Sequence, residues 1–336
     1  MSIRNYTRIL ASLAVAAATL STFAANPFLG QWELTIPGGG AGWLGVEEKG
    51  GALEASLLWG SGSVFPLDSA KVEGDQLLLT RKYQIDGKDA AGKKIKIDRV
   101  ENLTASVHGD HIQFLSVKPD DKVEGKNVTE KFSGRRQPPM PPAPDLSKVK
   151  FGPAKNLFNG KDLTGWRLTD PKAVNGWGVK EGLLVNNPAQ EEGKPHKRYG
   201  NLRTEHEFED FNLKVEVMVG KEQNSGIYLR GIYEVQVEES FGQGVDPHHM
   251  GAVYSRITPT VAAEKPPGEW QTLDITFVNR HVTVILNGKN IIDNKPVMGC
   301  TGGALWSDVS RPGPIYLQGD HTGITYRSLV LKPVVK

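Results

Sequence analysis

The sequence has almost no cysteine: Cys300 is the only one among its 336 residues. A single thiol cannot form an intramolecular disulfide, and it cannot supply the several thiolates of a structural zinc site. We therefore expect a hydrophobic core to hold the fold together, which a chain of this length can build. We interpret Cys300 as a small packed residue in a loop, because no activating partner stands beside it in the sequence.

The chain also has little net charge, since 40 Lys and Arg residues stand against 38 Asp and Glu residues. A general nucleic-acid binder needs a concentrated basic surface, so the composition argues against that class. Hydrophobic residues make up 38% of the chain, which is enough for a core and excludes wholesale disorder. The length indicates two domains, and 38 Gly and 21 Pro residues favour many short strands joined by turns.

Long apolar runs are missing as well, because no segment approaches the ~20 uninterrupted apolar residues of a membrane-spanning helix. The apolar stretch at residues 9–20 is shorter, and it follows Arg4 and Arg8. Small residues come after it, up to Ala24 and Ala25. This order is typical of a secretory signal. We predict cleavage after one of these two alanines, no membrane span in the mature chain, and a periplasmic or secreted location.

A proline-rich segment at residues 137–144 separates two β-rich blocks. Proline lacks the backbone N–H and fixes φ, so this run cannot join a ladder and favours an extended conformation. We interpret it as a semi-rigid linker, and a docking site for a proline-binding partner is the alternative. The predicted organisation is a signal peptide (1–25), a first domain (26–136), a linker (137–153) and a second domain (154–336).

The first block is predicted to be a meander of short antiparallel strands. Apolar and polar residues alternate in stretches such as Gln31–Ile36 and His111–Leu115, and glycine-rich turns such as Gly38–Gly40 lie between them. Closure into a small β-barrel would remove the exposed edges. The start at Phe28–Trp32 resembles the Gly-x-Trp opening of lipocalin-like barrels, which implies a barrel able to hold an apolar ligand.

The second block is predicted to form two packed antiparallel sheets, a sandwich or jelly roll. Apolar residues alternate with polar ones over residues 213–219 and again over residues 282–286. The Asn287-Gly288 pair that follows is a strong hairpin signal. No stretch shows a sustained helical period, so the predicted fold class is all-β.

Strand alternation gathers polar side chains on one face of this second block. Residues 233–238 place Tyr233, Val235 and Val237 toward the core and the residues between them on the opposite face. The side chains predicted on that polar face are Tyr228, Arg230, Glu234, Gln236, Glu238, Tyr316 and Gln318. Amides and carboxylates bind vicinal hydroxyls, so this face suits sugar recognition, and a plain solvated face is the alternative. Nothing marks the acid–nucleophile pair of a retaining glycosidase.

The second block resembles the 3-keto-disaccharide hydrolase domain family from Asn156 to about Pro333. The motifs that carry the resemblance are, in order, Leu157–Trp166, Trp177–Gly182, Asn224–Gln236, Gly251–Tyr254, Lys265–Trp270, Leu286–Gly288 and Gly313–Gln318. The resemblance implies a concanavalin-like jelly roll in an exported protein that acts on an oxidised disaccharide or glycoside. The chain departs from the family at Glu239, where Asp is usual, and at Gly319, an insertion that shifts the loop of His321.

The chemistry that the resemblance implies is an elimination, because a ketone at C3 acidifies the C2–H. A base removes that proton, the enolate expels the C1 substituent, and water adds back to give net hydrolysis. Glu234 is the first candidate base and His321 the second. Arg230 is the candidate for stabilising the enolate, with a divalent metal ion as the alternative, and no cofactor is assigned. The predicted substrate-binding residues are Glu205, Tyr228, Gln236, Tyr254, Gln318 and Asp320.

The stretch Asp246-Pro247-His248-His249 contains residue types that bind metals. Adjacent histidines point apart on an extended chain, so we predict no metal ligands there. The rival to an enzyme is a non-catalytic carbohydrate-binding module of the cell envelope. A cluster of acid, base and electrophile in a pocket would favour the enzyme, and a shallow aromatic platform would favour the binding module.

Overall fold

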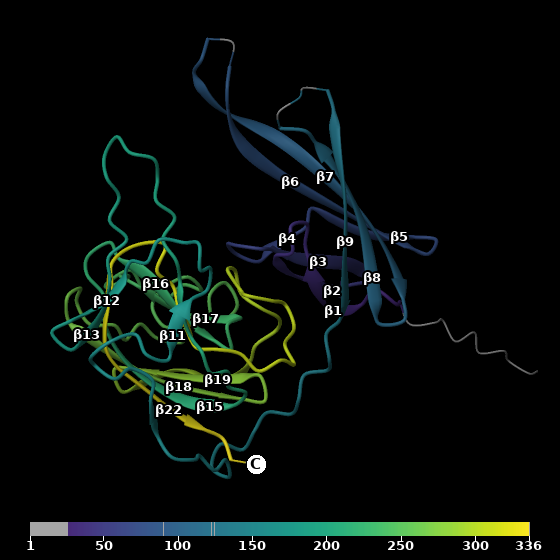
Figure 1. The fold of residues 1–336 in the computed structure, drawn as a ribbon. Coiled ribbons are helices and arrows are strands. Elements are labelled where there is room, and N and C mark those ends of the chain that lie inside the picture. Colours follow the sequence, from purple (N-terminus) through teal and green to yellow (C-terminus); the bar gives the residue numbers. More distant parts are fainter. Residues whose placement is uncertain (1–25, 90, 122, 124, 336) are drawn as a thin grey trace, which may run out of the picture.

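The computed structural model describes residues 26–89, 91–121, 123 and 125–335, and Figure 1 shows its two lobes. The predicted signal peptide lies outside the described residues. Every regular element in the described ranges is a β-strand, from β1 to β22, and all their ladders are antiparallel, which confirms the all-β prediction. Within the same ranges, no helix has the length and apolar character needed to cross a membrane.

The first lobe is a nine-stranded sheet with the order β4-β3-β2-β1-β9-β8-β7-β6-β5. Its strands are β1 (Gly30–Thr35), β2 (Ala41–Lys49), β3 (Ala52–Trp59), β4 (Phe65–Pro66), β5 (Ser69–Glu73), β6 (Gln76–Lys88), β7 (Lys94–His108), β8 (His111–Pro119) and β9 (Asn127–Arg136). Their inward side chains, among them Trp32, Leu57 and Phe114, form a core of their own. The predicted meander is therefore present.

A closed barrel is not observed, because β4 and β5 end the strand order and no ladder joins them within the described chain. The two strands are instead consecutive parts of one short segment. Leu67 donates its N–H to the Ala55 carbonyl next to β4, and Asp68 donates to the Thr80 carbonyl next to β5. This segment thus pairs with β3 through β4 and with β6 through β5. Pro66, at the end of β4, has no N–H with which to continue the ladder.

The second lobe contains two further sheets. The larger has the order β12-β13-β22-β15-β18-β19-β20, and β10 pairs with β22. The smaller has the order β11-β14-β21-β16-β17. The larger sheet comprises β10 (Lys155–Asn156), β12 (Trp177–Lys180), β13 (Leu183–Asn186), β15 (Phe211–Met218), β18 (Trp270–Val278), β19 (His281–Leu286), β20 (Lys289–Pro296) and β22 (Ile324–Pro333); the smaller comprises β11 (Trp166–Leu168), β14 (Leu202–Thr204), β16 (Asn224–Leu229), β17 (Tyr233–Glu238) and β21 (Tyr316–Leu317).

These two sheets pack face to face over one hydrophobic core. Tyr233 and Val235 of β17 meet the inner face of β18, where the rings of Tyr233 and Phe277 lie 5.1 Å apart. Burying one such side chain contributes about 1.5–3 kcal/mol. The prediction of a two-sheet antiparallel sandwich is confirmed, including the inward orientation of alternate β17 residues. The jelly-roll connection of its strands stays a prediction.

The proline-rich segment is packed against the sandwich rather than suspended between the lobes. Arg280 donates hydrogen bonds to the carbonyl oxygens of Pro138 (3.0 Å) and Pro139, and the Asn294 amide donates to the Pro144 carbonyl at 3.0 Å. Proline residues keep their carbonyl acceptors, so an extended run of them can be held by donors on a neighbouring sheet. The segment, called the strap below, is thus bound to the turn before β19 and to β20, and Figure 1 shows the chain after β9 running along the second lobe.

The two lobes also share apolar contacts. Trp43 and Leu58 of the nine-stranded sheet belong to the hydrophobic core of the sandwich, and both are buried. The guanidinium group of Arg256 lies 4.1 Å from the centre of the Trp43 ring. Cys300 is buried in the same cluster, and burial raises the pKa of its thiol to about 11. This agrees with the interpretation of Cys300 as a packed residue.

Candidate functional site

The candidate site lies on the outer face of the five-stranded sheet, where three strands align polar side chains. β16 pairs with β17 so that Tyr228 lies across from Glu234, and Tyr316 of β21 lies across from Tyr228 on the other side. Gly226 pairs with Gln236 and accepts a hydrogen bond from the backbone of Gln318. The polar face predicted from strand alternation is therefore real.

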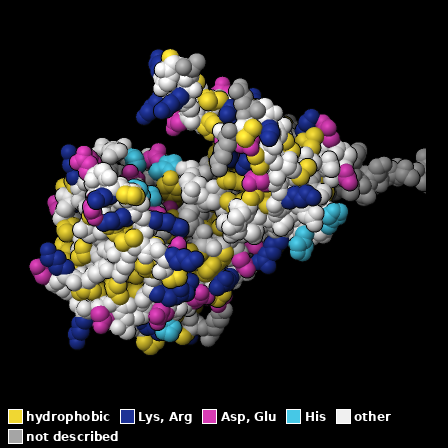
Figure 2. Space-filling view, turned by 45° about the horizontal axis from the view of Figure 1, so that its top comes forward, with side chains coloured by type: hydrophobic (Ala, Val, Ile, Leu, Met, Phe, Trp, Pro, Cys, Tyr) yellow, Lys and Arg dark blue, Asp and Glu magenta, His cyan; other side chains and the backbone are white. Residues whose placement is uncertain are grey.

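These side chains border a cavity of about 460 Å³, which lies within the usual size range of small-molecule sites. Its lining residues are Ser61, Gly62, Asn201, Asn224, Tyr228, Glu234, Gln236, Tyr254, Gly302, Gly303, Tyr316, Gln318, Asp320 and His321. Figure 2 shows histidine and acidic side chains gathered near the junction of the two lobes. The cavity combines carboxyl, amide, phenol and imidazole groups, which are the groups that bind and transform sugars.

Glu234 is the most strongly perturbed acid of this cavity. Only 3% of it is exposed, and burial raises the pKa of its carboxyl group to about 8, although a hydrogen bond from Tyr228 acts in the opposite direction. The carboxyl group occupies the space beside Gly226, where a Cβ atom would lie 2.2 Å from Oε1. A glycine at this position is therefore needed to admit the acid. A strongly raised pKa inside a cavity is a mark of functional carboxyl groups.

The hydroxyl group of Tyr228 faces two acceptors at once. It lies 2.9 Å from Glu234 Oε2 and 2.7 Å from the carbonyl oxygen of Gly302. A hydroxyl group has one hydrogen to donate. When Glu234 is protonated it can donate to Tyr228, and Tyr228 then donates to Gly302. The geometry thus accommodates the neutral acid, in agreement with its raised pKa.

Aromatic and amide groups form the rest of the wall. The rings of Tyr228 and Tyr316 are stacked with centroids 3.9 Å apart. The side-chain oxygens of Gln236 and Gln318 are buried and have no hydrogen-bond partner among the described residues. Buried polar atoms almost always have partners, so two unpaired acceptors in the wall of one cavity are candidate partners for the hydroxyl hydrogens of a sugar.

Asp320 and His321 lie at the more exposed side of the cavity. His321 Nδ1 is 2.9 Å from Asp320 Oδ1, and about half of the His321 side chain is exposed. The hydrogen bond with Asp320 raises the pKa of His321, and the charge of Glu234 acts in the same direction. The inserted Gly319 thus leaves His321 in the cavity together with Glu234.

Two of the predicted site residues lie elsewhere. β16 ends at Leu229, and Arg230 has a φ of +54°, so strand alternation no longer sets its direction. Its guanidinium group donates to the carbonyl oxygens of Val309 (2.9 Å) and Arg311 (3.0 Å), away from the cavity. The prediction that Arg230 faces the site is wrong for this reason. Glu205 is exposed in the loop after β14 and does not line the cavity.

The cavity also has lining residues outside the predicted set. Tyr316 is predicted on the polar face by the same alternation as Gln318, but it is not among the predicted substrate-binding residues. Asn201 and Asn224 stand at or near strand ends, where alternation gives no direction. Ser61 and Gly62 come from the loop between β3 and β4 of the first lobe, and no pattern in the sequence connects them with the second block.

The histidine pair after Asp246 does not converge. His248 Nδ1 lies 2.7 Å from Asp246 Oδ1 and its Nε2 lies 2.8 Å from Ser63 Oγ, whereas His249 Nδ1 lies 3.0 Å from the Gly244 carbonyl oxygen. No group of three or more His, Cys, Asp or Glu side chains that could hold a metal ion is found in the part of the chain that the structure describes.

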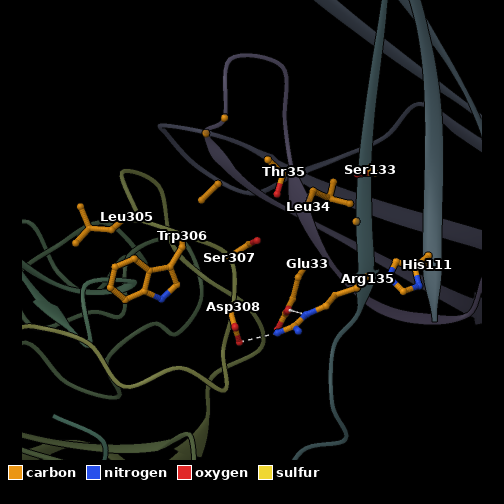
Figure 3. A pocket seen from close by; sticks show the side chains of 14 residues that line it. Glu33, Leu34, Thr35, His111, Ser133, Arg135, Leu305, Trp306, Ser307 and Asp308 are labelled. Atoms are coloured by element: carbon orange, nitrogen blue, oxygen red, sulfur yellow. Dashed lines mark hydrogen bonds and ion pairs between the residues drawn. The ribbon is translucent and has the colours of Figure 1, made fainter. Parts of the chain in front are cut away.

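A second cavity, of about 330 Å³, lies between the lobes (Figure 3). Glu33 is buried there, accepts a hydrogen bond from the Val309 N–H at 3.0 Å, and pairs with Arg135 at 2.8 Å. Arg135 also pairs with Asp308 at 2.8 Å. Burial raises the pKa of Glu33. This network joins residues of the two lobes. None of the predicted site residues lines this cavity, so we interpret it as part of the contact between the two lobes.

Comparisons with known proteins match the second block of the chain, which contains most of the residues of the candidate site. The model of the 3-keto-alpha-glucoside-1,2-lyase-like domain family matches residues 153–332, just over half of the chain. No curated protein matches the chain.

Several solved structures are similar. A candidate glycosyl hydrolase from Parabacteroides distasonis ATCC 8503 is 28% identical, with 58% of this chain and 92% of that chain covered and a TM-score of 0.43. A second candidate glycosyl hydrolase from the same organism is 22% identical. The match covers 54% of this chain and 94% of that chain, with a TM-score of 0.45. SCLam, a non-specific endo-beta-1,3(4)-glucanase of family GH16, is 12% identical. The match covers 59% of this chain and 94% of that chain, with a TM-score of 0.33.

Proposed function

Because the chain belongs to the 3-keto-alpha-glucoside-1,2-lyase-like domain family, we propose that it cleaves 3-keto-glycosides by elimination followed by addition of water. The base takes the proton from C2, and the electrons of that C–H bond form the enolate of the C3 ketone. The enolate then re-forms the ketone, makes the C1=C2 double bond and breaks the C1–O bond. The leaving oxygen takes a proton. Water adds its hydroxyl group to C1 and a proton to C2, which completes a net hydrolysis.

Glu234 is the base in this proposal, and His321 carries the complementary proton. A buried carboxylate with a pKa of about 8 is a far stronger base than an ordinary carboxylate. His321, whose pKa is raised by Asp320, supplies positive charge for the developing oxyanion or a proton for the leaving oxygen. Arg230 has no part in the chemistry, because its guanidinium group is bound to backbone carbonyls.

Substrate binding is assigned to the side chains around the base. The unpaired side-chain oxygens of Gln236 and Gln318 are the proposed acceptors for the hydrogens of sugar hydroxyl groups. Tyr228, Tyr254 and Asp320 complete the walls. The observation that carries the proposal is the buried Glu234 carboxyl group inside a cavity of sugar-binding side chains. A carbohydrate-binding module, the rival function, has no use for a buried acid of raised pKa.

The test is cleavage of paired substrates. A disaccharide oxidised at C3 and its unoxidised parent are incubated with the protein, and the released sugar is quantified. The oxidised substrate should be cleaved and the parent left intact, since without the ketone no carboxylate removes the C2 proton. Comparable cleavage of both would favour a two-carboxylate glycosidase mechanism. Binding of both without cleavage of either would favour the carbohydrate-binding module.

We further propose that the chain is exported, with cleavage near Ala25 and a periplasmic or secreted location, from the order of charged, apolar and small residues at its start. The domain boundaries at residues 136 and 154 are part of the same proposal. Sequencing the N-terminus of the mature protein tests the export, and a retained Met1 would contradict it.

A further inference from the structure

The polar face of the sandwich is a short groove with two different ends. Glu234, Gln236 and Glu238 follow one another on β17, and at 3.4 Å per residue they span about 14 Å. Asn224 lies across from Glu238, and its N–H donates to Thr322 Oγ1 at 2.7 Å. The half-exposed loop of His321 therefore lies at this end, where the groove meets solvent.

The other end, beside Glu234, is closed by the first lobe. The Tyr228 hydroxyl group next to Glu234 lies 2.7 Å from the Gly302 carbonyl oxygen. Behind it, a Cβ atom on Gly302 would lie 2.2 Å from the carbonyl oxygen of Gly62, so the two backbones touch. The Gly303 N–H also donates to the Gly60 carbonyl at 3.0 Å. A side chain at position 302 would therefore clash with the backbone of the first lobe.

The loop between β3 and β4, residues 60–64, is held in this position by side chains of the second lobe. The Val64 N–H donates to Ser255 Oγ at 2.8 Å, and Ser63 Oγ lies 2.8 Å from His248 Nε2. The His248 ring packs edge-on against Tyr254, a wall of the cavity, with centroids 4.9 Å apart. The loop is therefore tied both to the wall of the site and to its closed end.

We propose that the loop of residues 60–64 makes the groove a blind pocket, so that the chain selects compact 3-keto-glycosides over internal residues of polysaccharides. A substrate whose C2–H reaches Glu234 can extend only toward Asn224 and His321. An internal residue of a polymer needs an exit on both sides of the reacting sugar, and the loop blocks one of them. This inference rests on the proposed function and gives the first lobe a part in substrate choice.

The experiment compares a disaccharide oxidised at C3 of its non-reducing glucose with a linear tetrasaccharide oxidised at C3 of an internal glucose. The full chain should cleave the disaccharide with a kcat/KM about 100-fold higher. Equal values for the two substrates overturn the inference and leave the proposed function intact. Cleavage of neither substrate overturns the proposed function itself.

A loop variant provides a second, independent test. Ser61 is exposed and borders the cavity, so Ser61→Tyr should narrow it and raise the KM for the disaccharide about tenfold, with kcat less affected. Ser69→Tyr, on the exposed edge strand β5 of the same sheet, is the matched control and should leave KM unchanged. Thermal unfolding of both variants verifies that they fold. An unchanged KM in folded Ser61→Tyr shows that the loop does not contact the substrate.

Discussion

Replacing Glu234 by Gln should stabilise the protein at alkaline pH while removing its activity. The pKa of this carboxyl group rises from 4.5 to about 8 on folding because the group is buried. Between these pH values the folded state holds a proton that the unfolded state has released, so the free energy of unfolding falls as pH rises. The contribution of Glu234 to the free energy of unfolding is therefore full below pH 4.5 and is lost as pH rises through about 8. At about 1.4 kcal/mol per pH unit, the loss is about 5 kcal/mol.

A glutamine at position 234 does not ionise, so burial costs it no such free energy. Residue 234 should therefore not lower the free energy of unfolding of Glu234→Gln between pH 4.5 and about 8. Urea unfolding at pH 5, 7 and 9 measures the difference. At pH 5 the variant should be within about 1 kcal/mol of the wild type, which is the size of one altered hydrogen bond. At pH 9 it should be more stable by several kcal/mol. Its turnover should meanwhile fall about 10²–10⁴-fold, as expected for loss of a general base.

Glu238→Gln is the matched control, because Glu238 lies on the same strand and is less buried. Its stability profile should follow that of the wild type. Parallel profiles for the wild type and Glu234→Gln would refute the reasoning, since they would mean that Glu234 titrates alike in the folded and unfolded chains. Unchanged turnover in Glu234→Gln would make Glu234 a residue that only positions the sugar.

Five further results are expected. The kcat/KM for a 3-keto-glycoside should rise with pH toward about 8 as Glu234 loses its proton, and a flat profile would argue against it as the base; His321→Ala should lower turnover and change this profile. Arg230→Met should destabilise the fold in urea by about 1–3 kcal/mol, because the buried Val309 carbonyl and the part-buried Arg311 carbonyl lose their donor, and should leave the KM nearly unchanged. Trp43→Ala should cost about 3–5 kcal/mol of stability, and a loss below 1 kcal/mol would show that the lobes do not share a core. Limited proteolysis should cut the strap at residues 137–144 slowly, because its carbonyl groups are bound to the sandwich; rapid cutting would contradict that packing.

The sequence was informative wherever side-chain direction follows from a regular strand. The period of two placed Glu234 and Tyr228 on the polar face, and the turn signals gave the antiparallel order of neighbouring strands. The same rule failed at Arg230. The backbone of Arg230 itself is in the left-handed region, so the strand ends before it and its side chain points in another direction. Contacts between distant segments leave no periodic signal at all. For that reason neither the burial of Trp43 in the second lobe nor the presence of Ser61 at the cavity could be predicted.

The shared core between the lobes has a consequence for biosynthesis. The nine-stranded sheet is complete once residue 136 has been made, but Trp43 and Leu58 are covered by the second lobe, including the segment around Cys300. At 5–20 residues per second, the intervening part of the chain takes roughly 10–30 s to synthesise. During that interval a first lobe that folds as it is made displays an apolar patch with nothing to cover it. A nascent chain that stalls in this window should therefore aggregate or require a chaperone, although the finished protein does not expose the patch.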